Sequence, residues 1–270
     1  MRLGLLGCGT IGGEVVNAVI QGKLPRMKLV AVCDINRTNW IDSACSILGA
    51  VYIKNPTILY KKAEVVLEAA NPEVLKTYAI PLLNKGVDLI AMSVGAFADT
   101  SFYRKVYEYA LKAGRRVASP SGAIGGLDII RAAQSTGQLS SVLLSTIKNP
   151  RSLVGAPFFE GRKIDLKNLR KKTLLFDGSA AEAILGFPQN VNVAVAIGLA
   201  GLGPERTNVR IYADPKTTRT IHQIKAQGSF GELNLELKNF PSPQNPRTSY
   251  LAILSAIATL QQWTEPFRIG

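Results

Sequence analysis

The feature that most constrains this chain is the glycine pattern at residues 7–12, Gly-Cys-Gly-Thr-Ile-Gly, which directly follows a short apolar run at residues 2–6. This spacing is typical of a dinucleotide-binding turn between a β-strand and an α-helix. Gly7 permits the tight turn, Gly9 lets the backbone approach a pyrophosphate, and Gly12 lets the helix pack on the strand. The pattern therefore predicts a strand–turn–helix unit that holds the phosphates of a dinucleotide.

The residues around this turn predict which dinucleotide is bound. Thr10 and Ile11 begin the helix, whose free N–H groups favour a phosphate. Asp34 ends the next apolar run, in Val-Cys-Asp, at the place where a carboxylate binds the ribose hydroxyls. A carboxylate there repels the 2′-phosphate of NADP, whereas Arg37, three residues on, is able to hold it. We expect NAD or NADP as cofactor, with NAD favoured.

The first 120 residues alternate short apolar runs with helical patterns, which predicts an α/β domain with a doubly wound, Rossmann-type parallel sheet. The runs that we interpret as strands buried on both faces are residues 2–6, 27–33, 65–68, 88–92 and 115–118. Asn71 caps one helix, within which Pro81 predicts a kink or an early end. Asp99 or Thr100 caps another helix, which ends at Gly114.

The pattern then changes to longer strands, at residues 139–148, 207–213, 218–227 and 231–238. Short turns join the last three of them, which predicts a second, α+β domain on a mixed or antiparallel sheet. We therefore divide the chain into a dinucleotide-binding domain at residues 1–120 and a substrate or catalytic domain at 121–245. Residues 246–270 contain a C-terminal helix, from Pro246 to about Gln262, whose domain assignment stays open.

The composition of the chain argues against several classes of function. The chain has 270 residues and a net charge of +13, and its densest basic cluster lies at residues 162–172. This cluster contains no aromatic residue to stack on bases, so we interpret it as a solvated face rather than a nucleic-acid site. The three cysteines match no zinc pattern, and we predict no metal site. No apolar run reaches the ~20 residues that span a bilayer, and we expect a cytoplasmic protein with no membrane partner.

Five segments further along resemble the motifs of the L-aspartate dehydrogenase family. They are Ser-Pro-Ser-Gly-Ala-Ile-Gly-Gly-Leu-Asp at 119–128, Thr-Ile-Lys-Asn-Pro at 146–150, Phe-Pro-Gln-Asn-Val-Asn-Val-Ala at 187–194, Ala-Asp-Pro at 213–215 with Ile-His-Gln-Ile at 221–224, and Pro-Ser-Pro-Gln-Asn-Pro-Arg-Thr-Ser at 241–249. The resemblance implies NAD(P)-dependent oxidation of L-aspartate to iminoaspartate. That product hydrolyses to oxaloacetate and ammonia, or it feeds quinolinate and NAD synthesis.

The resemblance also implies roles for single residues. His222, the sole histidine of the chain, is the catalytic residue, and Ala123 and Asn190 contact the nicotinamide cofactor. An imidazole with an ordinary pKa of ~6.5 exchanges protons near neutral pH. The two carboxylates of aspartate need cations and N–H donors, for which Lys148 and a backbone turn at Ser121 are the candidates. A core histidine, a surface lysine and a helix-capping asparagine remain the alternatives for His222, Lys148 and Asn190.

The remaining expectations concern the partners of this protein and the other classes of protein to which it could belong. We expect a homo-oligomer, with a dimer favoured, and quinolinate synthase as a candidate partner in pyridine nucleotide biosynthesis. Semialdehyde dehydrogenases need a cysteine nucleophile in the second domain, and no cysteine follows Cys45. A homoserine-dehydrogenase-like enzyme and a non-enzymatic nucleotide- or nucleic-acid-binding protein stay open as alternatives.

Overall fold

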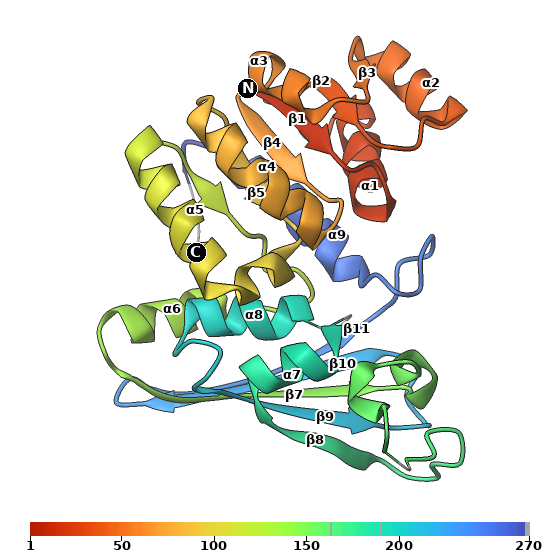
Figure 1. The fold of residues 1–270 in the computed structure, drawn as a ribbon, viewed down its shortest axis with the longest axis vertical. Helices are drawn as coiled ribbons and strands as arrows, with labels where there is room; N and C mark the ends of the chain where they lie inside the picture. Colours follow the sequence, from red (N-terminus) through yellow and green to blue (C-terminus); the bar gives the residue numbers. More distant parts are fainter. Residues whose placement is uncertain (163, 189–190, 268–270) are drawn as a thin grey trace. The chain divides into compact units, whose positions relative to one another are not determined.

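The computed structural model describes residues 1–162, 164–188 and 191–267. Within it the chain forms two compact units, each with a sheet of its own (Figure 1). The first unit comprises Met1–Pro120 together with the segment that begins at Ala252, and the second unit is Ser121–Leu251. The alternating strands and helices of the first 120 residues thus all belong to one unit.

The first unit contains a six-stranded parallel sheet in the order β3-β2-β1-β4-β5-β6, which confirms the predicted Rossmann-type fold. Its strands are β1 (Arg2–Leu6), β2 (Lys28–Cys33), β3 (Val51–Ile53), β4 (Val65–Glu68), β5 (Asp88–Ala91) and β6 (Val117–Ala118). Its helices are α1 (Thr10–Ile20), α2 (Asn39–Leu48), α3 (Leu59–Lys62), α4 (Pro72–Asn84), α5 (Thr100–Ala113) and α9 (Tyr250–Thr264). The strand order reverses between β1 and β4, where doubly wound sheets bind their ligands.

Local sequence signals set the ends of α4 and α5. The side chain of Asn71 accepts a hydrogen bond from the Val74 N–H, and the side chain of Asp99 caps α5 in the same manner. α5 ends at Gly114 in the left-handed conformation. Of the kink or early end that Pro81 predicts, the early end is wrong. α4 continues to Asn84, and the Pro81 carbonyl oxygen still accepts a hydrogen bond from the Lys85 N–H.

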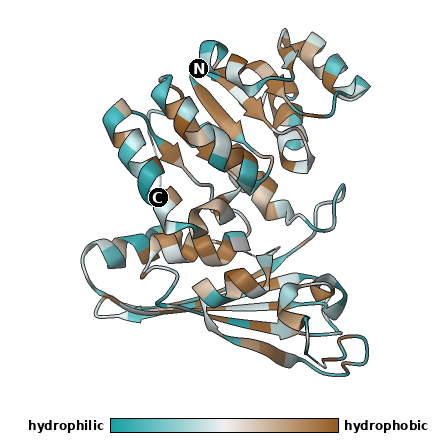
Figure 2. Cartoon of the chain, in the orientation of Figure 1, coloured by the Kyte–Doolittle hydropathy of each residue, from teal (hydrophilic) through white to brown (hydrophobic). Residues whose placement is uncertain are grey.

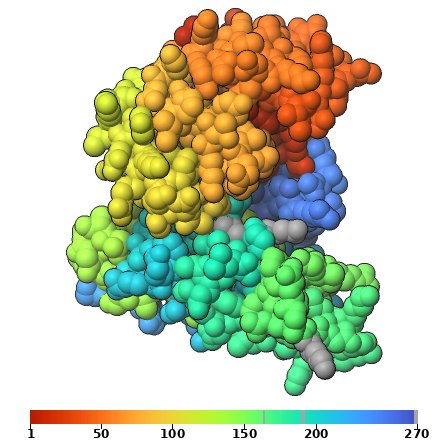
Figure 3. Space-filling model, viewed as in Figure 1, coloured from red at the N-terminus to blue at the C-terminus, as the bar shows by residue number. Residues whose placement is uncertain are grey.

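The hydrophobic core of the first unit contains residues from both ends of the chain. Leu3 and Leu5 of β1 are fully buried, and they belong to the same apolar cluster as Ala256 and Leu260 of α9. Figure 2 shows β1 and β4 mainly in the brown of apolar residues. Figure 3 shows the blue residues of α9 against the red residues of the N-terminus. The C-terminal helix, whose domain the sequence leaves open, therefore packs on the nucleotide-binding sheet.

The second unit contains a mixed five-stranded sheet in the order β11-β10-β7-β9-β8, within the predicted range of mixed or antiparallel. Its strands are β7 (Leu139–Lys148), β8 (Thr173–Ser179), β9 (Thr207–Ala213), β10 (Thr220–Gly228) and β11 (Gly231–Asn239). Its helices are α6 (Leu127–Ser135), α7 (Ala180–Gly186) and α8 (Val191–Ala200). Only β7 and β9 run parallel, and the other three pairs are antiparallel.

One face of this second sheet is covered by α6, α7 and α8 (Figure 1). Residues of β10 alternate accordingly, since His222 and Ile224 are buried whereas Lys225 is exposed. The sequence of β10 leaves it undecided which face is buried, because neither face is purely apolar. The structure places His222 on the buried face.

Candidate active site

The glycine-rich turn after β1 has the backbone that a dinucleotide needs. Gly7 has a φ of +95°, and a Cβ there would lie 2.7 Å from the backbone of Ala70. A Cβ on Gly12 would collide with the carbonyl oxygen of Gly7, so α1 packs too closely on the turn for any side chain. A Cβ on Gly9 would meet no atom within 4 Å, which leaves that side of the turn open. Each glycine thus meets the requirement that the spacing predicts.

The amino end of α1 faces the same turn. Gly9 is its N-cap and has no side chain to occupy the first N–H groups of the helix, to which Thr10 and Ile11 belong. Such N–H groups and the helix dipole favour an anion. The residues present therefore fit a pyrophosphate.

Asp34 lies at the carboxyl end of β2, beside this turn. Its Oδ2 accepts a hydrogen bond from the Cys8 N–H at 2.6 Å, and its Oδ1 accepts one from the Asn36 N–H at 2.8 Å. Two backbone donors thus fix the carboxylate next to the turn, and lone pairs remain for further donors. This is the position of a ribose-binding carboxylate in a dinucleotide fold.

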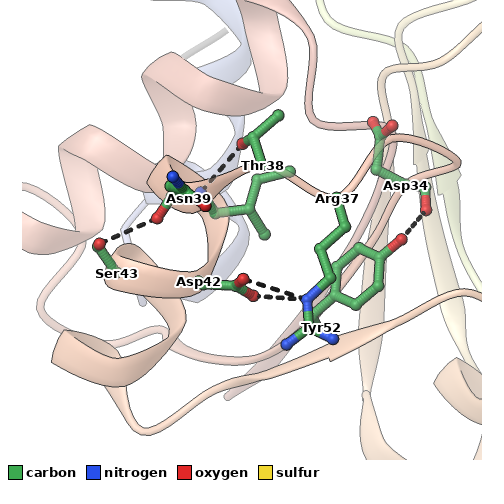
Figure 4. Close-up of polar contacts among 8 residues, drawn as sticks. Asp34, Arg37, Thr38, Asn39, Asp42, Ser43 and Tyr52 are labelled. Atoms are coloured by element: carbon green, nitrogen blue, oxygen red, sulfur yellow. Dashed lines mark hydrogen bonds and ion pairs between the residues drawn. The ribbon is translucent and has the colours of Figure 1, made fainter.

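The side chain of Arg37 lies near Asp34 but has partners of its own (Figure 4). Its Nε donates to both carboxylate oxygens of Asp42, at 2.8 and 3.1 Å, and its guanidinium lies 5.1 Å from the ring centre of Tyr52. The Tyr52 hydroxyl in turn donates to the carbonyl oxygen of Asp34 at 2.8 Å. Sequence reasoning missed Asp42 and Tyr52, although the acidic residue in the first turn of α2 was a visible signal.

Glu68 is a third residue that the sequence analysis missed. It ends β4 with no exposed surface, and its carboxylate accepts from the Ala70 N–H at 2.8 Å and the Ser93 hydroxyl at 2.8 Å. Burial raises the pKa of this carboxyl above its ordinary value. Because the backbone of Ala70 lies against Gly7, Glu68 holds the loop that supports the glycine-rich turn.

The cysteines are not reactive groups. Burial, with a contribution from Asp34, raises the pKa of the Cys8 thiol to about 12 and that of Cys33 to about 11. Both therefore remain thiols near neutral pH. All three cysteines are free, and none of the described residues forms a cluster of three metal-binding side chains.

His222 is buried on β10 of the second unit. It is 4% exposed and stands opposite Thr146 in the register of β10 and β7, and its Nδ1 is 3.0 Å from the Thr146 hydroxyl. Burial and the charge of Lys148 lower its pKa to about 3. This differs from the ordinary imidazole value of ~6.5 that the sequence leads us to expect, so His222 is a neutral imidazole near pH 7.

Lys148 ends β7 on the same side of the sheet as Thr146. It is half-buried, and burial lowers its pKa to about 8. Both side chains line a hollow whose other walls are apolar. These are Leu144, Ala183, Ile184, Phe187, Ala194, Val209 and Ile211. The structure thus places Lys148 near His222, the residue that the sequence analysis predicts to be catalytic.

Ser121 and Ala123 form the turn that leads into α6. The Ile124 N–H donates to the Ser121 carbonyl oxygen at 3.4 Å, and the Ala123 carbonyl oxygen accepts from the Asn239 side chain at 2.8 Å. β11 therefore holds this turn in place. Asn190, the other residue expected to contact the nicotinamide, lies outside the described residues.

Two further interpretations of the sequence concern the basic segment and membrane-spanning helices. The described part of the basic segment 162–172 is mostly exposed, and Lys172 lies 4.5 Å from the ring centre of Tyr212. In the parts of the chain that the structure describes, no helix is both long and apolar enough to cross a membrane.

Comparison with known proteins gives matches to dehydrogenases along both units of the chain. Residues 128–263 match the family described as aspartate dehydrogenase, C-terminal, and residues 7–120 match the NAD-binding domain of homoserine dehydrogenase. An L-aspartate dehydrogenase of Methanosarcina mazei is 40% identical over 100% of this chain and 99% of its own length. One of Nitrosopumilus maritimus is 36% identical over the same shares.

A solved structure agrees with these relatives. The aspartate dehydrogenase of Thermotoga maritima superposes with a TM-score of 0.78 at 30% identity, and the match covers 100% of this chain and 99% of that one. The homoserine-dehydrogenase-like alternative is not favoured, because that match stops at residue 120 whereas the aspartate dehydrogenase matches continue through the second unit. The chain belongs to the aspartate dehydrogenase family.

Proposed function

We propose that this protein is an NAD(P)-dependent dehydrogenase that oxidises L-aspartate to iminoaspartate. The observation that carries this proposal is the match with L-aspartate dehydrogenases over the full length of both chains. The glycine-rich turn and the buried His222 with Lys148 supply the two kinds of site that such an enzyme needs. A second candidate function has no comparable support.

The cofactor is NAD or NADP, and the residues of the first unit fit it. Gly7, Gly9 and Gly12 with the amino end of α1 would hold the pyrophosphate, and Asp34 would bind the ribose hydroxyls. When bound, the nicotinamide accepts the hydride that leaves the α-carbon of the substrate. NAD is favoured, because Asp34 repels a 2′-phosphate and the Nε of Arg37 is already bonded to Asp42.

The substrate side of the site belongs to the second unit. Lys148 supplies a cationic end to an otherwise apolar hollow, which suits one carboxylate of a small dicarboxylic acid. His222, held by Thr146, contributes hydrogen bonding to the substrate or to the water that hydrolyses the imine. The turn at Ser121 and Ala123 would add backbone N–H groups, and by the family resemblance Ala123 and Asn190 would contact the nicotinamide cofactor.

The expectations about oligomeric state, location and partner remain predictions. They are a homodimer, a cytoplasmic location, and delivery of iminoaspartate to quinolinate synthase in pyridine nucleotide biosynthesis. Sedimentation, cell fractionation and a coupled assay with quinolinate synthase test the three separately.

A panel of L-amino acids with NAD and with NADP tests the activity itself. We expect L-aspartate to reduce the cofactor, followed by its absorbance, far better than L-glutamate, L-alanine or L-homoserine. Equal or faster reduction with L-homoserine would exclude the assignment. Salt-sensitive nucleic-acid binding with no turnover of any amino acid would instead favour the non-enzymatic alternative.

A further inference from the structure

Three polar side chains gather on the covered face of the second sheet. Thr146 and Lys148 are two residues apart on β7, so they point to the same face, and His222 stands opposite Thr146 on β10. The Thr146 hydroxyl binds His222 Nδ1, while both Thr146 and Lys148 line the hollow. His222 is almost fully buried and is absent from the described lining, so the amine of Lys148 is the more accessible basic group.

Apart from Thr146 and Lys148, the described side chains that line the hollow are apolar. The described residues that line the hollow from α7, α8 and β9 are all apolar, and the titratable group that faces it from β10 is His222. Glu182 of α7 is exposed and bonded within its own helix cap, to Ser179. Burial in such surroundings disfavours the charged form of an amine and so lowers its pKa.

We propose that Lys148 is the base that takes the proton from the α-ammonium of the substrate, and that His222 stays neutral throughout. This rests on the proposed dehydrogenase function and assigns the proton transfer within it. Thr146 is then a positioning residue, because it fixes the ring of His222 through Nδ1 and leaves Nε2 to bind the substrate or water.

The ionisation of the two groups supports this division of roles. Burial lowers the pKa of Lys148 to about 8, so a large fraction of the amine is neutral at mildly alkaline pH. The pKa of His222 is lowered to about 3, partly by Lys148 itself, so a second cation beside the amine is disfavoured. A base with a pKa near the working pH is the effective one.

The step moves one proton and no electrons. An N–H bond of the substrate α-ammonium breaks, and the proton joins the lone pair of Lys148 Nζ. The substrate becomes a neutral amine, whose nitrogen lone pair can form the C=N bond when the α-hydrogen leaves as hydride. Lys148 becomes an ammonium, which also stabilises the nearby carboxylate of the bound dicarboxylate.

The test is the pH dependence of kcat/KM for L-aspartate in the full-length enzyme. Turnover by the wild type establishes the proposed function independently, and we expect its kcat/KM to rise through about pH 8 as Lys148 loses its proton. Lys148→Ala should lower kcat by ~10²–10⁴-fold and abolish this rise. His222→Asn should lower kcat but keep the rise. Lys225→Ala, on the exposed face of β10, is the matched control and should change neither.

Two further measurements separate a base from a merely cationic residue. An arginine at this position keeps the positive charge but cannot lose its proton near neutral pH. We therefore expect Lys148→Arg to retain substrate binding and lose turnover. Added ethylamine should restore turnover to Lys148→Ala in proportion to the neutral amine, and circular dichroism should show a native fold. The proposal is overturned if the rise persists in Lys148→Ala, if it vanishes in His222→Asn, or if Lys148→Arg turns over like the wild type.

Discussion

At the scale of single residues, Asp34 is expected to set cofactor choice. Its carboxylate is fixed by the N–H groups of Cys8 and Asn36 beside the glycine-rich turn. Asp34→Ser removes an acceptor for the ribose hydroxyls and the repulsion toward a 2′-phosphate, so the ratio of kcat/KM for NAD over NADP should fall. Steady-state kinetics with both cofactors measure this ratio. An unchanged ratio would mean that Asp34 does not face the ribose.

Asp42 is expected to act on the same choice through Arg37. Asp42→Asn removes a charge that holds Arg37 and repels a 2′-phosphate, so kcat/KM for NADP should rise. Exposed ion pairs contribute ~0.2–1 kcal/mol, so the rise should be about 1.4- to five-fold. Asp177→Asn is the control, because it breaks the exposed pair with Arg210 in the other unit. A rise of the same size in that control would refute the role of Asp42.

His222 is expected to be needed for turnover but not for cofactor binding. His222→Ala should lower kcat by ~10²–10³-fold, the scale for losing a hydrogen bond to the reacting group. NADH affinity, measured by fluorescence titration, should shift little, because the glycine-rich turn and Asp34 are intact. Gln223→Ala, next to it on the opposite face of β10, is the control. Full activity of His222→Ala, or loss of its fold, would make His222 a core residue instead.

At the scale of elements, the packing of α1 on the glycine-rich turn is expected to decide cofactor affinity. Gly12→Ala places a Cβ against the Gly7 carbonyl oxygen, so helix or turn must move. Overpacking costs ~1–3 kcal/mol. If the turn is what moves, this cost corresponds to a roughly five- to 150-fold weaker affinity for NADH. Gly13→Ala is a matched control, because its Cβ would lie 3.6 Å from the Trp40 ring in ordinary contact. Calorimetric titration with NADH compares the two, and equal affinities would contradict the prediction.

Two strands were missed by sequence reasoning for physical reasons. β3 has only three residues at the edge of its sheet, too few for a periodic pattern. β8 follows the basic segment, and half-buried and exposed residues do not alternate along it, because it is the edge strand of the second sheet. Strands buried between neighbours, such as β1 and β4, were predicted correctly because nearly every residue in them must be apolar.

At the scale of the whole molecule, the last helix is expected to stabilise the first unit. Leu260 of α9 has no exposed surface and packs in the same cluster as β1. Leu260→Ala should therefore lower the free energy of unfolding by ~2–5 kcal/mol. Leu254→Ala, at a site that is 44% exposed on the same helix, should cost far less. Urea unfolding measures both, and hydrogen exchange should show the loss in β1 rather than β7. Equal costs would contradict this packing.

Features that depend on residues close together in the chain could be predicted from the sequence. The glycine-rich turn, Asp34 at the end of β2, and the caps at Asn71 and Asp99 follow from local backbone geometry, which short motifs specify. The resemblance of separate motifs to one family also indicated His222 as the catalytic residue.

Features that depend on residues far apart in the chain were set by the fold. It placed α9 on the first sheet, paired Thr146 with His222 across 76 residues, and put Lys148 beside them in apolar surroundings. The pKa of a side chain depends on its burial and on neighbouring charges, which no local pattern specifies. For this reason the sequence could only predict the histidine and the lysine as site residues, whereas burial in the fold lowers the pKa of Lys148 to about 8 and that of His222 to about 3.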